Sequence, residues 1–413
     1  MSVHQNIVSM NQEMLELLQA SIGIQSVSGN EDGFIRFIQK WADESGLKTD
    51  LFEIDPAADY FITAPKHIPL SGRPALILSL PGKGKGRSLM FNAHSDTVSS
   101  GGTDDWTGDP FSGKFVNGKV YGRGSCDAKG PLISALWAMA VLGKKYPEGL
   151  SGDLMLELVP GEEDCVGLGT LGSIRRGYKT DASIVLEPTE NIPRCASRGG
   201  LRFGITTRGK AIHGTVKWLG KDAILSARKV LSALDELENR WNDKFADPLF
   251  QAYPIARPVT VDKINGGQWQ GMVCDSCRCE GYFELLPGDD LLKWRQKFSE
   301  DLPSLLPGED MEIEFSESYY GHRTSKKSEL CLIAESVCRK STPEFEWSAF
   351  NSGCEAGVRA RLSGTPTLVW GPGSVEQAHS PDEFVEFESV GRCAELFAET
   401  VLDWMNKTDK NID

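Results

Sequence analysis

Histidine and carboxylate side chains follow the short apolar segments of this sequence. The residues concerned are His94, Glu163, Glu187 and His379. A further carboxylate, Asp127, lies in the glycine-rich stretch 122–130, just before a predicted helix. Imidazole nitrogens and carboxylate oxygens are common ligands of Zn²⁺, and a carboxylate can bridge two ions about 3.5–4 Å apart. These residue types therefore predict a site for two zinc-like ions.

Each of these residues can be assigned to one of the two ions. We assign Asp127 as the bridging ligand, and the surrounding glycines let the backbone approach what Asp127 holds. His94 and Glu187 are assigned to one ion. Glu163 and His379 are assigned to the other. The same ligands accept cobalt or manganese in place of zinc.

Two carboxylates next to these ligands are predicted to have other roles. Asp96 is close enough to His94 in the chain to accept its second ring N–H and fix its tautomer. Glu162 precedes Glu163, and because neighbouring side chains diverge, we expect Glu162 to act as a general base rather than a ligand. Alone, a His-x-Asp pair is usually structural and a Glu-Glu pair is usually a solvated turn. Their joint occurrence after apolar segments favours a catalytic site.

An α/β sheet is expected to position these residues, because short apolar segments alternate with helical ones. Buried strands are expected at residues 75–80, 88–93, 153–159, 182–186 and 367–370. Helices are expected at residues 12–25, 30–45, 129–146, 328–340 and 388–406. In open α/β sheets ligands bind outside the carboxyl ends of the strands, so the histidines and carboxylates could converge on one crevice.

Residues 194–321 have a different pattern. Strands are expected at residues 201–207, 258–264, 277–286 and 311–319, and helices at 222–241 and 289–305. This order, β-α-β-β-α-β, is typical of a ferredoxin-like unit. Because the first pattern resumes afterwards, we expect 194–321 to be a domain inserted into a discontinuous domain of residues 1–193 and 322–413.

Composition excludes several classes of protein. The 413 residues, 40% of them hydrophobic and 25% charged, suffice for two or three folded domains. With 44 basic and 58 acidic residues the net charge is −14, which argues against a nucleic-acid partner. No apolar run approaches the roughly 18 residues of a membrane helix, and the N-terminal residues lack an export pattern. Ten scattered cysteines form no disulfide framework, so a cytoplasmic setting is expected.

The motifs resemble those of the dinuclear zinc amidohydrolases and exopeptidases, a family that includes acetylornithine deacetylase, succinyl-diaminopimelate desuccinylase, aminoacylase, carnosinase and bacterial glutamate carboxypeptidase. The matching stretches are FNAHSDTV, WTGDPFSGKFVNGKVYGRGSCDAKG, PGEED, LEPT, GKAIHGT and WGPGSVEQAHSPDEFV. The resemblance implies the same ligands and base, and a mixed-sheet catalytic domain of the zinc exopeptidase type with an inserted lid and dimerisation domain. It also implies a homodimer in which His213 of GKAIHGT reaches the partner's active site and stabilises the oxyanion.

The segments that would contact the substrate depart from the pattern of this family. In GYFELLPGDD, Glu284 occupies the position of an arginine that commonly receives a substrate carboxylate, and its negative charge would repel such a group. In INGGQWQGMVCD, Gly271 and Cys274 stand where asparagine and proline are usual. The loop SGCEA, which begins with Ser352 and Gly353, replaces the usual Gly-Gly-Thr-Asp-Ala. We expect Ser352, Gly353 and Glu284 to contact the substrate.

The sequence predicts hydrolysis of an amide bond by a metal-activated water. The first candidate substrate is an N-acyl amino acid, as for acetylornithine deacetylase, because small acyl groups suit a site that a lid closes. The alternatives are a dipeptidase or carboxypeptidase, and an amidase with a cationic substrate that lacks the usual carboxylate, which Glu284 favours. A non-catalytic binding protein on a hydrolase scaffold is the alternative from another class. The complete set of ligands and base argues against it.

Overall fold

The computed structural model describes residues 2–54, 72–84, 86–165, 167–243 and 247–406. The chain divides into two compact units. The first unit contains Met1–Ser197, His322–Phe350 and Cys354–Asp413, and the second contains Arg198–Gly321 and Asn351–Gly353. The chain therefore leaves the first unit, forms most of the second, and then returns to the first.

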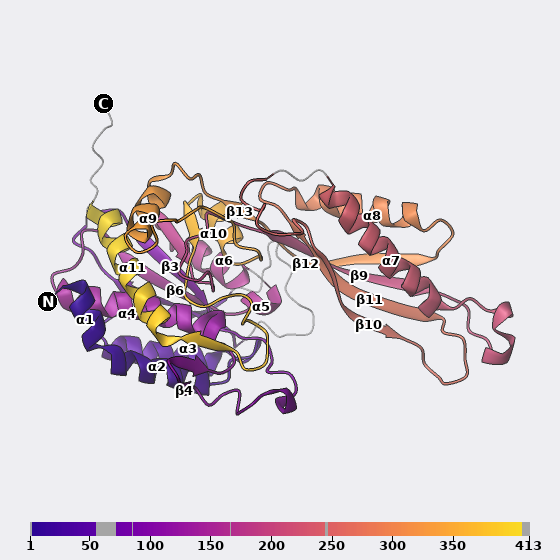
Figure 1. Cartoon of the computed structure of the whole chain (residues 1–413), viewed down its shortest axis with the longest axis horizontal. Helices are drawn as coiled ribbons and strands as arrows, with labels where there is room; N and C mark the ends of the chain where they lie inside the picture. The colour runs from indigo at the N-terminus through magenta and orange to yellow at the C-terminus, as the bar shows by residue number, and fades with distance from the viewer. Residues whose placement is uncertain (1, 55–71, 85, 166, 244–246, 407–413) are drawn as a thin grey trace. The chain divides into compact units, whose positions relative to one another are not determined.

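The first unit is built on a mixed six-stranded sheet (Figure 1). In spatial order its strands are β1 (Lys48–Glu53), β2 (Pro74–Leu80), β6 (Leu154–Val159), β3 (Leu89–His94), β7 (Ala182–Val185) and β14 (Thr367–Val369). β3 pairs in parallel with β6 and β7, and β14 pairs in parallel with β7. β2 is antiparallel to both of its neighbours, β1 and β6. This mixed sheet confirms the α/β fold class predicted from the sequence.

Helices cover the sheet of the first unit. They are α1 (Val3–Ser9), α2 (Asn11–Gly23), α3 (Asp32–Glu44), α4 (Gly130–Lys145), α5 (Glu162–Cys165), α6 (Leu168–Arg175), α9 (Glu329–Arg339), α10 (Ala356–Ser363) and α11 (Phe387–Asn406). α4 is apolar on all sides and buried over residues 130–142, as expected of a helix enclosed by its neighbours. Every residue of β3 is buried, so both faces of this central strand are covered.

Short elements complete the first unit. They are the helical turns η1 (Thr103–Asp105) and η2 (Ser125–Lys129) and the strands β4 (Lys114–Val116), β5 (Lys119–Tyr121), β15 (Phe384–Glu386), β8 (Ala196–Ser197) and β13 (His322–Arg323). β15 pairs with β5, which pairs with β4, and β8 pairs with β13. These strands are too short to produce an apolar run, which is why the sequence does not predict them.

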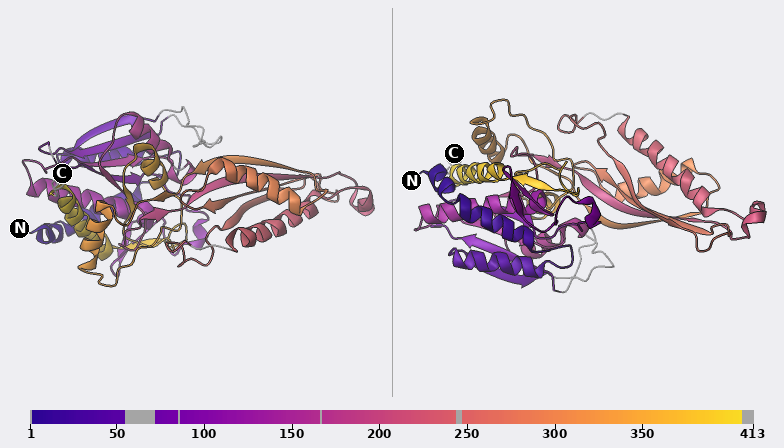
Figure 2. Two further views of the ribbon diagram at one scale, coloured as in Figure 1. Left: turned by 90° about the horizontal axis from the view of Figure 1, so that it is seen from above. Right: turned by 60° about the horizontal axis from the view of Figure 1, so that its bottom comes forward.

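The second unit has the element order β-α-β-β-α-β. Its elements are β9 (Gly199–Arg208), η3 (Gly214–Leu219), α7 (Ala223–Asn242), β10 (Val259–Gly266), β11 (Ser276–Leu285), α8 (Leu291–Leu305) and β12 (Met311–Tyr319). The strands form an antiparallel sheet in the order β10-β11-β9-β12. α7 and α8 lie over one face of this sheet (Figure 2).

Helix capping and an aromatic core stabilise the second unit. Asp222 accepts the backbone N–H of Ile224 at the start of α7, and Asp290 caps α8 in the same way. Beneath the helices, the rings of Phe283 and Phe298 stack with their centroids 5.2 Å apart.

Across the described residues of both units, no helix combines the length and the apolar character needed to cross a membrane.

Candidate metal centre

The residues predicted to bind metal all lie in the first unit, most of them just beyond its strands. His94 is the last residue of β3, Glu187 follows β7, and Glu163 lies in α5 after β6. Asp127 lies in η2, and His379 lies between β14 and β15. Because β3, β6 and β7 are parallel neighbours, their carboxyl ends meet at one edge of the sheet. The fold therefore brings these side chains together.

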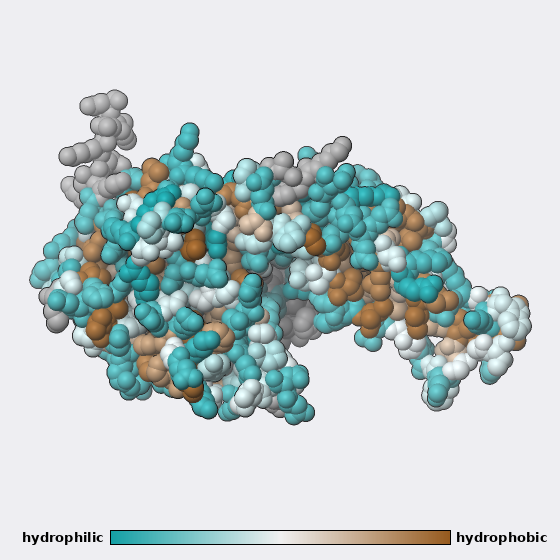
Figure 3. Space-filling view, in the orientation of Figure 1, coloured by the Kyte–Doolittle hydropathy of each residue, from teal (hydrophilic) through white to brown (hydrophobic). Residues whose placement is uncertain are grey.

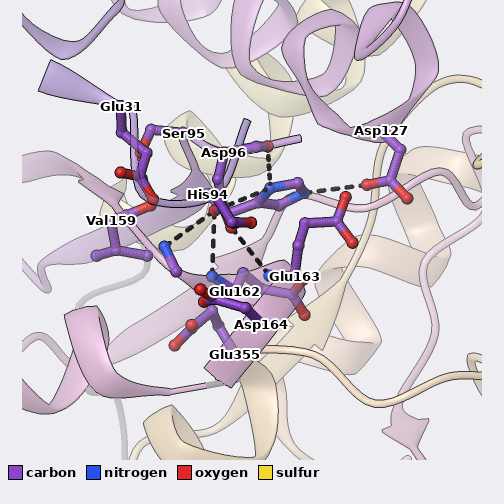
Figure 4. Close-up of polar contacts among 12 residues, drawn as sticks. Glu31, His94, Ser95, Asp96, Asp127, Val159, Glu162, Glu163, Asp164 and Glu355 are labelled. Carbon is purple, nitrogen blue, oxygen red and sulfur yellow. Dashed lines mark hydrogen bonds and ion pairs between the residues drawn. The ribbon is translucent and has the colours of Figure 1, made fainter. Parts of the chain in front are cut away.

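The side chains form two groups that share Asp127. One group contains His94, Asp127 and Glu187. The other contains Asp127, Glu163 and His379, and the ligand atoms of each group lie within 4.8 Å of one another. Asp127 Oδ1 lies 3.0 Å from His94 Nε2 (Figure 4), whereas its Oδ2 lies 3.6 Å from His379 Nε2. Each oxygen of Asp127 thus faces a different group, as expected of a bridging carboxylate.

The carboxylates of this site repel one another in buried surroundings. Burial, and then the charge of Glu187, raises the pKa of Glu162 well above its usual value. Burial, and then the charge of Asp127, raises the pKa of Glu187 and of Glu163. Burial lowers the pKa of His94, but the hydrogen bond with Asp127 and the nearby carboxylates of Asp96 and Glu187 together outweigh burial and raise the pKa of the ring well above its usual value. Divalent cations would offset the repulsion, so this donor set fits a two-ion centre.

Asp96 holds the backbone of the segment that carries Glu162 and Glu163. Its carboxylate accepts hydrogen bonds from the backbone N–H groups of Gly161, Glu162 and Glu163 at 3.0, 3.1 and 3.1 Å (Figure 4). His94 Nδ1 lies 2.9 Å from the backbone oxygen of Asp96 and 3.7 Å from its carboxylate. The backbone oxygen of Asp96 is therefore the closer partner of the His94 ring. The sequence predicts that the carboxylate of Asp96 has this role.

Glu162 lies beside both groups and is 9% exposed. Among the described residues, no hydrogen-bond donor reaches its carboxylate. A buried carboxylate with a raised pKa and no competing donor is suited to accept a proton from water.

The remaining predicted site residues belong to the second unit. His213 is exposed, and its Nδ1 lies 2.8 Å from Thr215 Oγ1. Glu284 is buried near the end of β11, where its Oε1 accepts a hydrogen bond of 3.2 Å from the hydroxyl of Tyr319. Burial raises the pKa of Glu284 to about 7, although Arg198 and Tyr319 act in the opposite direction.

Ser352 and Gly353 pack within the same unit. The backbone oxygen of Ser352 accepts the N–H of Arg198 at 3.1 Å. Gly353 lies against the ring of Tyr319, and a Cβ atom at this position would come within 1.9 Å of Tyr319 Cε2. The glycine is therefore required by close approach of the ring to the backbone. The second unit thus brings Ser352, Gly353 and Glu284 near the same two residues, Arg198 and Tyr319.

Comparison with protein families identifies the chain. A profile described as "Peptidase family M20/M25/M40" matches residues 90–403, a span that includes all the predicted metal ligands. The chain belongs to this family. As a member of the M20 family, it is a hydrolase.

Relatives of this M20 protein carry the names of deacylases. It is 24% identical to the N-formyl-4-amino-5-aminomethyl-2-methylpyrimidine deformylase of Bacillus subtilis, with 98% of each chain covered. It is 26% identical to the acetylornithine deacetylase of Pectobacterium carotovorum, with 94% of this chain and 96% of the relative covered. Among solved structures, human carnosine dipeptidase 1 superposes with a TM-score of 0.78 at 15% identity, covering 98% of this chain and 99% of the other. This structural similarity confirms the M20 fold.

Two residues that the sequence does not single out place the ligand-bearing segments of this M20 protein. Arg73 is 1% exposed, forms an ion pair with Glu31, and lies 3.2 Å from Asp164 of α5. Glu383 is fully buried and accepts backbone N–H groups from the turn that carries Asp127. The only sequence signal for Glu383 is its place in the stretch WGPGSVEQAHSPDEFV. No pattern in the sequence indicates Arg73.

Proposed function

We propose that this M20 hydrolase removes a small acyl group from an amine, with an N-acyl amino acid as the first candidate substrate. The observation that carries the proposal is the sharing of Asp127 between two metal-binding groups, with Glu162 beside both. The relatives named deacetylase and deformylase support an acyl group as the part that is cleaved off. A dipeptidase activity has weaker support, because the similarity to carnosine dipeptidase concerns the fold alone.

The five ligands would hold two divalent cations, with zinc as the first candidate and cobalt or manganese as alternatives. In this assignment His94 and Glu187 would hold one ion, Glu163 and His379 would hold the other, and Asp127 would be shared between them. Such ions supply Lewis acidity, which lowers the pKa of water and polarises the substrate carbonyl. Glu162 accepts the proton of the attacking water and passes it to the leaving nitrogen.

We also propose a homodimer, in which His213 of the partner subunit stabilises the oxyanion. Exposed apolar side chains on the second unit support an association of two copies. Figure 3 shows hydrophobic residues gathered on the visible face of this unit around α7. The exposed large side chains of the unit include Trp218, Ile224, Leu225, Ile264 and Trp269. Ile264 lies on β10, an edge strand that could pair with a second copy.

Ile264→Asp is expected to convert the dimer into a monomer, because a charge would be placed on an apolar sheet edge. Turnover should fall about 10²–10³-fold, the usual cost of losing one oxyanion donor. Sedimentation velocity and kcat measure the two effects. The matched control is Leu332→Asp, since Leu332 of α9 is 52% exposed and Ile264 is 53% exposed. A wild-type protein that is monomeric and fully active would refute the dimer.

Glu284 favours a second candidate, an amidase whose substrate lacks the usual carboxylate. Its carboxylate is 4% exposed and close to Tyr319, and its Oε2 has no hydrogen-bond partner among the described residues. An acidic group in this position would disfavour a substrate carboxylate and favour an N–H donor. The aminopyrimidine in the name of the deformylase relative is an amine without a carboxylate.

The experiment that tests the function is a substrate panel of N-acyl amino acids, N-formyl and N-acetyl amines without a carboxylate, and dipeptides. Release of free amine by the metal-loaded wild type identifies the class. Glu284→Arg is expected to shift the ratio of kcat/KM at least roughly tenfold toward carboxylate-bearing substrates, the effect of one charged hydrogen bond. Glu312→Arg, at an exposed position on β12, controls for the change in net charge.

Two outcomes would contradict these proposals. An unchanged ratio in Glu284→Arg would remove Glu284 from substrate selection. Two bound ions per chain without turnover of any amide would favour the non-catalytic binding protein instead.

A further inference from the structure

Glu383 connects the chain segments that carry Asp127 and His379, two ligands of the same metal-binding group. It follows His379 closely in the sequence and directly precedes β15. Its Oε1 accepts the backbone N–H groups of Cys126 at 2.8 Å and Asp127 at 3.1 Å. Its Oε2 accepts the backbone N–H of Gly124 at 3.0 Å. One buried carboxylate thus binds three amides of the turn that presents Asp127.

Arg123 completes the environment of this carboxylate. Its Nη1 donates a hydrogen bond of 2.6 Å to Glu383 Oε2, and the two residues are 3% and 0% exposed. A buried charge is stable when it is paired and hydrogen-bonded, and Glu383 meets both conditions. These contacts therefore explain why Glu383 is buried, and Glu383 does not need to be a metal ligand.

The turn that carries Asp127 depends on hydrogen bonds from residues outside it. Gly124 has a φ of +83°, and a Cβ atom there would come within 2.6 Å of Thr97 Cγ2. The N-cap residue of η2 is Gly124, which has no side chain to accept the first amides, and the carboxylate of Glu383 accepts those of Cys126 and Asp127 instead. The backbone oxygen of Glu383 also accepts the N–H of Gly122 at 2.8 Å, and the next residue, Phe384, pairs with Tyr121 of β5. Side chain and main chain of Glu383 therefore hold the same turn.

We infer that Glu383 is a positioning residue that fixes the separation between Asp127 and His379, and with it the affinity of their group for a divalent cation. This inference rests on the metal centre of the proposed function. The group of His94 and Glu187 should depend less on Glu383. Asp127 is common to both groups, but His94 ends β3 and Glu187 follows β7, and neither makes a hydrogen bond to Glu383.

The test is titration of the metal-free Glu383→Gln variant with Zn²⁺ and with Co²⁺, followed by calorimetry and by the visible spectrum of Co²⁺. The glutamine keeps the size of the side chain but replaces one acceptor oxygen with a donor that faces backbone N–H groups. The affinity of one of the two binding steps is expected to fall by roughly 10- to 100-fold, the usual effect of replacing a residue that supports a metal ligand. Its Co²⁺ spectrum should change, and the other step should stay within a few-fold.

The matched control is Glu386→Gln, because Glu386 is an exposed glutamate at the end of β15, the short strand that Glu383 directly precedes. It should leave both binding steps unchanged. Glu383→Asp keeps the charge on a shorter side chain and is expected to recover part of the lost affinity. Wild-type affinity for both ions in Glu383→Gln would overturn the inference.

A second measurement does not depend on the folding of a variant. In the metal-free wild type, hydrogen exchange of the amides of Gly124, Cys126 and Asp127 should be slow, because Glu383 binds them before any metal does. Exchange as fast as in an unstructured peptide would overturn the inference. If the wild type binds two ions, shows this protection and hydrolyses no amide, the proposed function fails while the role of Glu383 stands.

Discussion

Glu162→Gln is expected to lower kcat by about 10²–10⁴-fold, the usual contribution of a general base. The amide has nearly the same size but cannot accept a proton from water. Metal content should stay at the wild-type level, because the two ligand groups share Asp127 and do not include Glu162. Steady-state kinetics on the substrate found in the panel, together with elemental analysis, measure both quantities.

Glu148→Gln is the control for this substitution, since Glu148 is an exposed glutamate of the same unit. It should leave kcat and metal content unchanged. Full activity of Glu162→Gln would show that another residue accepts the proton. A loss of metal in Glu162→Gln would instead show that Glu162 is a ligand.

Asp127→Asn is expected to abolish the binding of both ions, whereas Glu187→Gln should abolish the binding of one. Asp127 is the only residue common to the two groups, and an asparagine has one uncharged oxygen in place of the two charged oxygens that a bridging carboxylate provides. For Asp127→Asn we expect less than one bound ion per chain. Its kcat/KM should fall by more than the roughly 10- to 100-fold that is typical when a residue hydrogen-bonded to a metal ligand is replaced. Metal content after dialysis, determined for both variants and the wild type, is the measurement.

The comparison between the two variants decides whether Asp127 is the bridge. Equal losses in Asp127→Asn and Glu187→Gln would contradict it, because each residue would then serve a single ion. Retention of the fold should be verified by circular dichroism, since the turn around Asp127 is held through its backbone N–H rather than its side chain.

The sequence predicts the central strands and the residues that follow them because both have strong local signals. The expected strand at 153–159 corresponds to β6, Leu154–Val159, and the one at 88–93 to β3, Leu89–His94. Buried parallel strands are continuous apolar runs, which are visible without knowledge of their partners. A histidine or carboxylate that ends such a run is visible for the same reason.

Other parts of the structure have no local signal. β1 reads KTDLFE and is only partly buried at the edge of the sheet, so its residues show no apolar run. Arg73 and Glu383 act through contacts with residues remote in the sequence, such as Asp164 and Asp127. The partner of the His94 ring could not be predicted either, because the choice between the main chain and the side chain of Asp96 depends on the conformation of one loop.

The pairing of β8 with β13 has a consequence for how proteins of this design can change. Ser197 and His322 are partners in this small sheet, so the ends of the intervening segment are held together by the first unit. Insertions are tolerated where chain ends are adjacent, and the entropy of closing a loop grows only slowly with its length. The segment between these two residues can therefore lengthen, shorten or be exchanged by recombination while the α/β sheet and its ligands are inherited unchanged. New substrates could arise in this way on an old catalytic core.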